Sequence, residues 1–269
     1  MKLQLLKHCL VAILLFISLA SYGQFNNDNN NKYWNNLHGK IKSCTTIGYN
    51  VIKGDTAGKQ INLFDSVVFN KKGQIIKIFK SNTVRGADIN KRISNTYKYD
   101  NKGNLIEQVF HGTDGKAQVK CVYSYLTSKN KVTLKIFFLP EKDSSRVTDT
   151  YKINASGRIL EKYHYNESFV PGVKYQYGKT VYKYNAKGLR VEEIGYDLNG
   201  LEKSKRFLKY NQNNEMSEST YVWLKDQRAN ESMTFTDTKY DKHHNWLVRN
   251  RFIHGKLHSV TERTITYYK

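Results

Sequence analysis

The sequence predicts an all-β protein: a long antiparallel meander of repeated hairpins, twisted and curling into an open or partly closed sheet. Apolar and polar residues alternate in one segment after another, which is the two-residue period of a half-buried strand. Short clusters of Asn, Asp and Gly separate these segments, as they do at hairpin turns. The chain contains only 2 prolines, which suits many hydrogen-bonded strands.

The clearest hairpin lies at residues 97–110. Its first arm alternates aromatic and polar residues up to Tyr99, and its second arm alternates again from Leu105. Asp100 and Gly103 lie between the arms, where a tight turn requires positive φ angles. The same pattern recurs along the chain, with turn-entry residues at Asn70, Asp100, Asn154, Asn185, Asn211 and Asp241.

These turns follow one another at roughly thirty residues, except for one double interval between Asp100 and Asn154. A degenerate copy at residues 122–134 fills that interval, so we expect seven hairpins. Looser turns such as Asn199-Gly200 lie between them, and together they predict about sixteen strands and almost no helix. The positive-φ position is Gly in four copies and relaxes to Asn214 and His244 in the last two.

Tyr97-Lys98-Tyr99-Asp100 followed by Gly103-Asn104-Leu105 is similar to the Tyr-x-Tyr-Asp-x-x-Gly-Arg-Leu unit of the YD-repeat, or RHS-like, family. Looser matches begin at Tyr182 and Thr238, and the resemblance covers roughly residues 65–269. It implies a short exported bacterial member of that family, with antiparallel strands spiralling into a sheet or shell. It also implies that the repeat itself carries no catalytic residues.

The first residues predict export. Residues 1–23 carry Lys2 and Lys7, then an apolar run, then small residues before Gln24, as a secretory signal peptide does. A membrane anchor is the alternative, but it needs about 20 apolar residues and this run is shorter. We expect an Asn-rich flexible leader at 24–36, a hairpin-repeat domain at 37–269, no transmembrane helix, and a periplasmic or secreted protein.

The charge balance favours an anionic partner. The chain has 44 Lys and Arg against 23 Asp and Glu, and removing residues 1–23 lowers its net charge from +21 to +19 by taking away two lysines. An anionic glycan or envelope polymer, or another protein, is the expected partner, whereas an intracellular nucleic acid does not fit an exported chain. Since the lysines recur along the whole chain, a solvated face that resists aggregation is the preferred interpretation of the charge.

The richest candidate binding surface combines tyrosine and lysine. Aromatic faces beside cations bind sugars, bases and acidic polymers, but tyrosine ladders also stabilise exposed sheets by cross-strand pairing alone. Both interpretations apply to this segment, and the irregular residues Phe169 to Gly172 interrupt it. The predicted binding residues are Tyr163, Tyr165, Lys174, Tyr175, Tyr177, Tyr182, Lys183 and Tyr184.

No catalytic, phosphate-binding or metal-binding motif is present, so we expect no enzyme activity, no cofactor and no metal site. Two of three acids, Glu161, Glu192 and Glu193, are the candidates for paired carboxylates of a glycosidase, although isolated surface glutamates near lysines are the commoner case. His243 and His244 point to opposite faces of an extended chain and are expected in a turn. Cys44 and Cys121 lie too many strands apart for a disulfide in a flat sheet, so two buried free thiols are expected.

The sequence thus favours a non-enzymatic exported protein that presents a Lys/Tyr-rich β-surface to an envelope or extracellular partner. The alternatives are an extracellular glycan-active enzyme, a shielding partner of a toxin, and an outer-membrane barrel. The last shares the alternating pattern, but many strand segments here mix Lys or Glu into the apolar face, as around Val191.

Overall fold

The computed structural model describes residues 37–51, 59–81, 91–126, 128, 130–139, 145–154, 157–167, 174–224 and 230–269. The predicted signal peptide and leader lie outside these ranges. Within them the chain forms sixteen strands and no α-helix. The first eight are β1 (Ile41–Val51), β2 (Lys59–Phe69), β3 (Ile75–Ser81), β4 (Lys91–Tyr99), β5 (Leu105–His111), β6 (Ala117–Leu126), β7 (Lys131–Phe138) and β8 (Ser145–Ile153). The other eight are β9 (Ile159–Glu167), β10 (Lys174–Tyr184), β11 (Arg190–Tyr196), β12 (Glu202–Tyr210), β13 (Met216–Trp223), β14 (Glu231–Tyr240), β15 (Trp246–Ile253) and β16 (Lys256–Tyr267).

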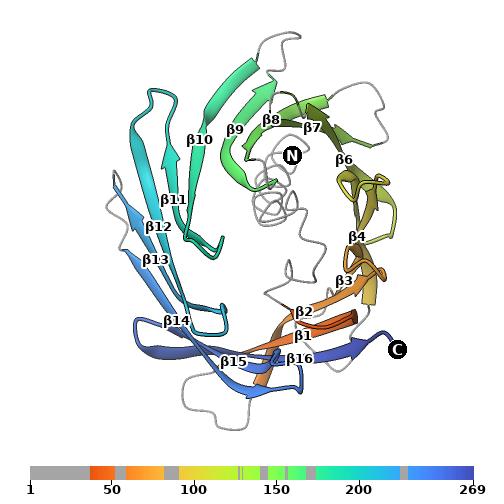
Figure 1. Ribbon diagram of the computed structural model, residues 1–269, viewed down its shortest axis with the longest axis vertical. Coiled ribbons are helices and arrows are strands. Elements are labelled where there is room, and N and C mark those ends of the chain that lie inside the picture. The colour runs from red at the N-terminus through yellow and green to blue at the C-terminus, as the bar shows by residue number, and fades with distance from the viewer. Residues whose placement is uncertain are drawn as a thin grey trace, which may run out of the picture.

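Every strand pairs antiparallel with the next one, which confirms the predicted meander of consecutive hairpins. The prediction of an open or partly closed sheet is wrong, because β16 also pairs with β1 and closes the sheet into a barrel (Figure 1). In this seam Cys44 lies opposite Ile265 and Thr46 opposite Arg263. Closure removes both unpaired edges and encloses the apolar face, the two problems that an open sheet of this length would leave unsolved.

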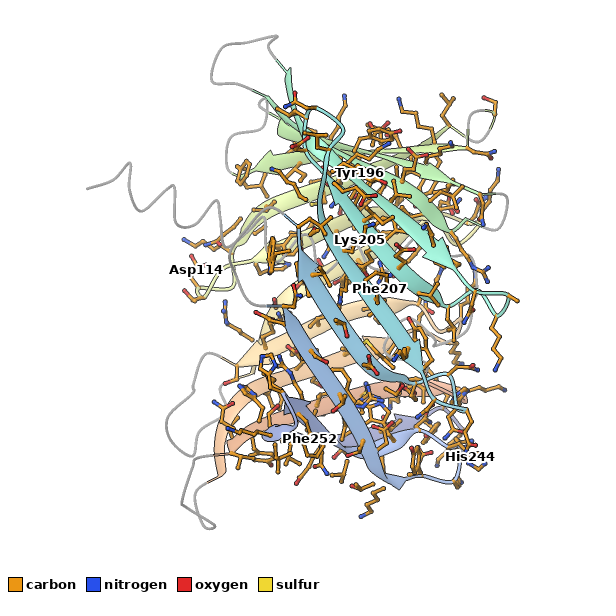
Figure 2. All side chains as sticks on the ribbon, turned by 90° about the vertical axis from the view of Figure 1, so that its left-hand side faces the viewer. Asp114, Tyr196, Lys205, Phe207, His244 and Phe252 are labelled. Carbon is orange, nitrogen blue, oxygen red and sulfur yellow. The ribbon has the colours of Figure 1, made fainter. Side chains whose placement is uncertain are left out.

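The six predicted turn-entry residues all lie at one end of the barrel, which we call the turn rim. At each turn the side chain of the entry residue caps backbone amides: Asn70 Oδ1 accepts hydrogen bonds from the amides of Lys72 and Gln74, both at 3.0 Å. The predicted positive-φ residues are confirmed, with φ of 60° at Asn214 and 63° at His244. Figure 2 shows His244 at this rim and Asp114, in the turn between β5 and β6, at the opposite one.

A tyrosine at the end of a strand joins each of several hairpins to the previous one. Its hydroxyl donates to the backbone carbonyl of the residue that opens the second arm of the previous hairpin, as Tyr99 does to Ile75 at 2.8 Å. We call these hydrogen bonds tyrosine staples. The others are Tyr125 to Leu105 at 2.8 Å, Tyr184 to Ile159 at 2.7 Å and Tyr210 to Arg190 at 2.7 Å.

The outer face of the barrel is polar and carries cross-strand ion pairs. Glu107 binds Lys98 on one neighbouring strand and Lys120 on the other, each at 2.7 Å. Lys183 and Glu192 form an equivalent pair between β10 and β11 at 2.7 Å. Many strand lysines therefore have a carboxylate beside them, which favours the solvated-face interpretation for the strands.

The inner face differs between the two halves of the barrel. From β1 to the start of β9 it holds one apolar cluster that includes Val132, Leu134 and Tyr151, all fully buried. Cys44 and Cys121 belong to this cluster as free thiols, as expected. Burial raises the pKa of Cys121 to about 12, so its thiol is protonated at neutral pH.

From β9 to β16 the inner face is largely ionic. Lys162 contacts Asp149 of β8 at 3.1 Å, and each side chain is only 4% exposed. Further along, Glu193 lies 3.1 Å from Arg190 and 3.7 Å from Arg206. The pairing of these buried charges offsets the cost of removing them from water.

Candidate functional site: a lysine-lined pocket at the turn rim

The predicted Lys/Tyr segment occupies two neighbouring strands. Tyr163 and Tyr165 lie on β9, and Gln176 and Lys179 of β10 lie opposite Tyr165 and Tyr163 respectively. The remaining predicted residues are all on β10: Lys174, Tyr175, Tyr177, Tyr182, Lys183 and Tyr184. The side chains of Tyr165, Lys174, Tyr175 and Tyr177 lie outside the part of the chain that the structure describes.

The other four side chains do not form one surface. Tyr182 and Tyr184 face inward: Tyr182 packs against the apolar cluster, and Tyr184 forms one of the staples. Lys183 and Tyr163 face outward, where Lys183 pairs with Glu192 and the Tyr163 hydroxyl donates to Glu161. Tyr182 and Tyr184 therefore fit the alternative interpretation of structural tyrosines, and a binding role for the segment stays a prediction.

An outward lysine and tyrosine row does exist, but it runs across strands rather than along them. The ammonium group of Lys179 lies 5.0 Å from the ring centroid of Tyr196 on β11, within cation–π range. Beyond it, Lys205 of β12 pairs with Glu202 at 2.7 Å. Figure 2 shows Tyr196, Lys205 and Phe207 on this side of the barrel. The sequence pattern missed this row because pairing between strands, and not spacing along one strand, creates it.

A pocket of about 540 Å³ lies at the turn rim, where the two ends of the sheet meet. Its walls come from four separate places: the segment before β1, the β2–β3 turn, the β4–β5 turn and the residue after β16. Four lysines line it, and no lining residue is acidic. The lining residues are Leu37, His38, Gly39, Lys40, Ile41, Asn70, Lys71, Lys72, Gly73, Asn101, Lys102, Gly103 and Tyr268.

Hydrogen bonds hold the walls of the pocket together. Gln74 donates its side-chain amide to the Gly103 carbonyl at 3.1 Å, which joins the two turns. Tyr268 links the remaining walls, because its backbone amide donates to Lys40 at 2.8 Å and its hydroxyl to Phe69 at 2.5 Å. The apolar floor is Leu37 and Ile41, which are 2% and 0% exposed. The pocket is thus a built feature of the barrel seam.

The segment before β1 is fixed by one amide side chain on the β14–β15 turn. Asn245 accepts a hydrogen bond from the His38 amide at 2.5 Å and donates to the His38 carbonyl at 2.9 Å. Gly39 follows with φ of +92°, and a Cβ there would lie 3.0 Å from the Tyr267 ring. A residue other than Gly would therefore be strained and crowded at this point of the pocket wall.

The pocket lysines differ from the strand lysines in their partners. Within the described ranges, no carboxylate forms an ion pair with Lys40, Lys71, Lys72 or Lys102. The nearest turn acid, Asp100, is occupied by the turn itself. Slight burial raises its pKa, but hydrogen bonds from Asn104 and from the Lys102 amide outweigh this and lower the pKa below its usual value. Uncompensated positive charge therefore gathers at the pocket, which can bind an anionic group.

The other residues singled out in the sequence do not converge. Glu192 lies on the outer face with Lys183, whereas Glu193 lies on the inner face with Arg190, so the two carboxylates cannot flank one bond. His243 stacks on Tyr267 with ring centroids 4.4 Å apart, and His244 occupies the positive-φ turn position. Among the described residues, no group of three His, Cys, Asp or Glu side chains is placed to hold a metal ion.

Sequence reasoning missed the pocket because its lysines come from distant parts of the chain. Lys72 and Lys102 occupy equivalent positions in consecutive repeat turns, and Lys71 lies beside Lys72. Lys40 joins them through the pairing of β1 with β2, which places the start of β1 beside the end of β2. The described residues contain no helix that is long and apolar enough to cross a membrane.

Comparison with known proteins gives no family. No family model matches the chain, and no curated protein sequence matches it. A porin-like protein from Bacteroides uniformis resembles the structure with a TM-score of 0.40 at 10% identity, over 86% of this chain and 99% of that one. The complex TcdB2-TccC3-Cdc42 gives 0.33 at 10% identity, over 76% of this chain but only 12% of that one. A DUF1329 family protein from Desulfovibrio piger gives 0.17. At such scores the description of the fold rests on this chain alone.

Proposed function

We propose that this chain is an exported, non-enzymatic repeat barrel that binds an anionic glycan or another anionic envelope polymer at the lysine-lined pocket of the turn rim. The observation that carries the proposal is the contrast between the two sets of lysines. Strand lysines such as Lys98 and Lys183 are compensated by glutamates, whereas the four pocket lysines have no acidic neighbour in the lining. An anionic ligand finds its lowest energy where positive charge is uncompensated and walls are preformed.

Membership of the YD-repeat family is part of the proposal. Two features of the repeat support it: the tyrosine that ends a strand forms the staple, and the acid or amide after it caps the turn. Export is supported by the signal-peptide pattern of residues 1–23. Ion pairs such as Lys209–Glu218 at 3.0 Å on the outer face support a wall that faces water, where a lipid-facing barrel would carry an apolar band.

The test compares two triple variants that remove the same charge. The first replaces Lys71, Lys72 and Lys102 by Gln, and the second replaces Lys98, Lys152 and Lys209 by Gln on the outer strands. Binding of fluorescent dextran sulfate and of polyphosphate is measured by fluorescence anisotropy at several salt concentrations. We expect the pocket variant to bind at least tenfold more weakly and the strand variant to stay within about twofold of the original protein.

An equal loss in the two variants would show that net charge alone attracts the polymer, and the pocket would then have no special role. Absence of binding by the unaltered protein at low salt would also contradict the proposal. N-terminal sequencing of the protein recovered from the envelope or medium tests the export component, with Gln24 as the expected first residue.

A further inference from the structure

The inner face of β13 to β16 holds a second group of charges, which is separate from the rim pocket. Arg249 binds Asp237 through two hydrogen bonds of 2.5 and 2.9 Å, and it also contacts Glu215 at 3.2 Å. Nearer to the middle of this half, Glu193 is held between Arg190 and Arg206. Among the described residues, these inner carboxylates form their close contacts with arginines other than Arg263, the arginine opposite Thr46 in the barrel seam. Arg263 interacts with Glu215 and Asp237 through charge at longer range.

Arg263 is buried without an acceptor. Its side chain is on the inner face of β16 and the residue is 5% exposed. None of its three guanidinium nitrogens has a hydrogen-bond partner among the described residues. Burial lowers the pKa of Arg263 to about 10, and the group therefore remains cationic at neutral pH. A guanidinium offers five N–H donors, so a fully buried one normally meets a carboxylate, a phosphate or several carbonyl groups.

The neighbour of Arg263 adds another unused donor. The guanidinium carbon lies 3.3 Å from the ring centroid of Trp246, which holds the flat group by a cation–π contact. The indole Nε1 of Trp246 is also buried, and no described residue accepts a hydrogen bond from it. Donors without acceptors are costly to bury, and here two such side chains are in contact.

We propose that Arg263 and Trp246 form an internal binding site for a compact oxyanion, a carboxylate or a phosphate group, that enters from the lumen of the barrel. The planar fork of Arg263 matches two oxygens of either group, and the Trp246 ring fixes the plane of the fork. The site is separate from the rim pocket in its residues: neither Arg263 nor Trp246 lines that pocket. The two sites can therefore fail or succeed independently.

Thermal unfolding of the purified protein, followed by fluorescence, tests this site. Potassium phosphate and sodium succinate are titrated separately at constant ionic strength, balanced with chloride, and the response to each shows which oxyanion the site prefers. For the original protein we expect a saturable rise in Tm of ~5 °C at one hundred times Kd. In Arg263→Met the saturable rise should disappear, because the guanidinium fork is removed.

Two further variants keep the test decisive. Arg263→Lys retains the charge and loses the fork, so we expect it to bind the same anion at least tenfold more weakly even if Arg263→Met does not fold. The Lys71, Lys72, Lys102 triple variant should keep the full anion response. An undiminished rise in Arg263→Lys or Arg263→Met, or no rise in the original protein with either anion, would overturn the internal site without affecting the rim pocket.

Discussion

The two halves of the barrel have the same backbone and different interiors. β1 to β8 enclose apolar side chains such as Leu134 and Tyr151, whereas β9 to β16 enclose ion pairs such as Arg249 with Asp237. Tyrosine staples occur in both halves, at Tyr99 and at Tyr210. The turns and the staples between neighbouring hairpins thus do not depend on what fills the barrel. The repeat determines the backbone of the wall, whereas the side chains of the inner face differ between the two halves.

The halves should nevertheless respond differently to mutation. Apolar burial is non-directional, so losing one side chain in the first half removes its own contribution and leaves a cavity. In the second half, the loss of one charge also strands its partner, which is then buried without compensation. The ionic half should therefore show larger single effects, and these should depend on pH where a carboxylate loses its partner.

The largest effect is expected for Arg249→Met, which leaves Asp237 and Glu215 without their partner. We expect a loss of about 3–5 kcal/mol in the free energy of unfolding at pH 7, measured by urea denaturation. Burial already raises the pKa of Glu215, and removing Arg249 raises it further. A carboxyl group whose pKa is raised in the folded state destabilises the fold as the pH rises and ionises it. The deficit in the free energy of unfolding should therefore shrink as the pH is lowered from 7 towards 5.

Lys209→Met is the matched control, because it removes one cation from the outer face, where Glu218 remains in water. Its effect should stay within about 1 kcal/mol at either pH. A deficit in Arg249→Met that does not change between pH 7 and pH 5 would show that the carboxylates are not the cause, and the distinction between the two halves would lose its electrostatic basis.

A smaller and pH-independent effect is expected for Leu134→Ala in the apolar half. Leu134 is completely buried on β7, and its truncation should cost about 3 kcal/mol. Thr133→Ala, at the neighbouring outward position, should cost less than about 1 kcal/mol in the same urea titration. If Leu134→Ala proved as mild as its neighbour, the apolar cluster would not be the core of this half.

Local patterns predicted the wall of this barrel well. The turn-entry residues, the positive φ of Asn214 and His244, and the count of strands all follow from interactions within one hairpin. Closure was not predicted, because it depends on pairing between β1 and β16, which lie at opposite ends of the chain. No hairpin carries a signal for that contact.

The candidate site was harder to predict from the sequence, because it too depends on contacts between separate hairpins. Tyr182 and Tyr184 were grouped with Lys183 because they are close in sequence, yet alternation sends the tyrosines inward and the lysine outward. The pocket lysines, by contrast, come together across neighbouring turns and through the pairing of β1 with β2, and the seam adds Tyr268 to the pocket. Arg263 belongs to no sequence motif. It is distinguished by its burial without a hydrogen-bond acceptor among the described residues.

The smallest predicted effect tests what the two halves share. Tyr99→Phe in the first half and Tyr210→Phe in the second each remove one staple and leave a backbone carbonyl without its donor. Both should cost about 1 kcal/mol in the free energy of unfolding, because the hydroxyl makes one neutral hydrogen bond in each case. Tyr196→Phe is the control, since its hydroxyl reaches Glu202 only at 3.5 Å, and it should be nearly neutral. Equal losses would show that the staples stabilise the wall to the same extent in both halves. A loss at Tyr99 alone would mean that the charges stabilise the ionic half and that its staple is redundant.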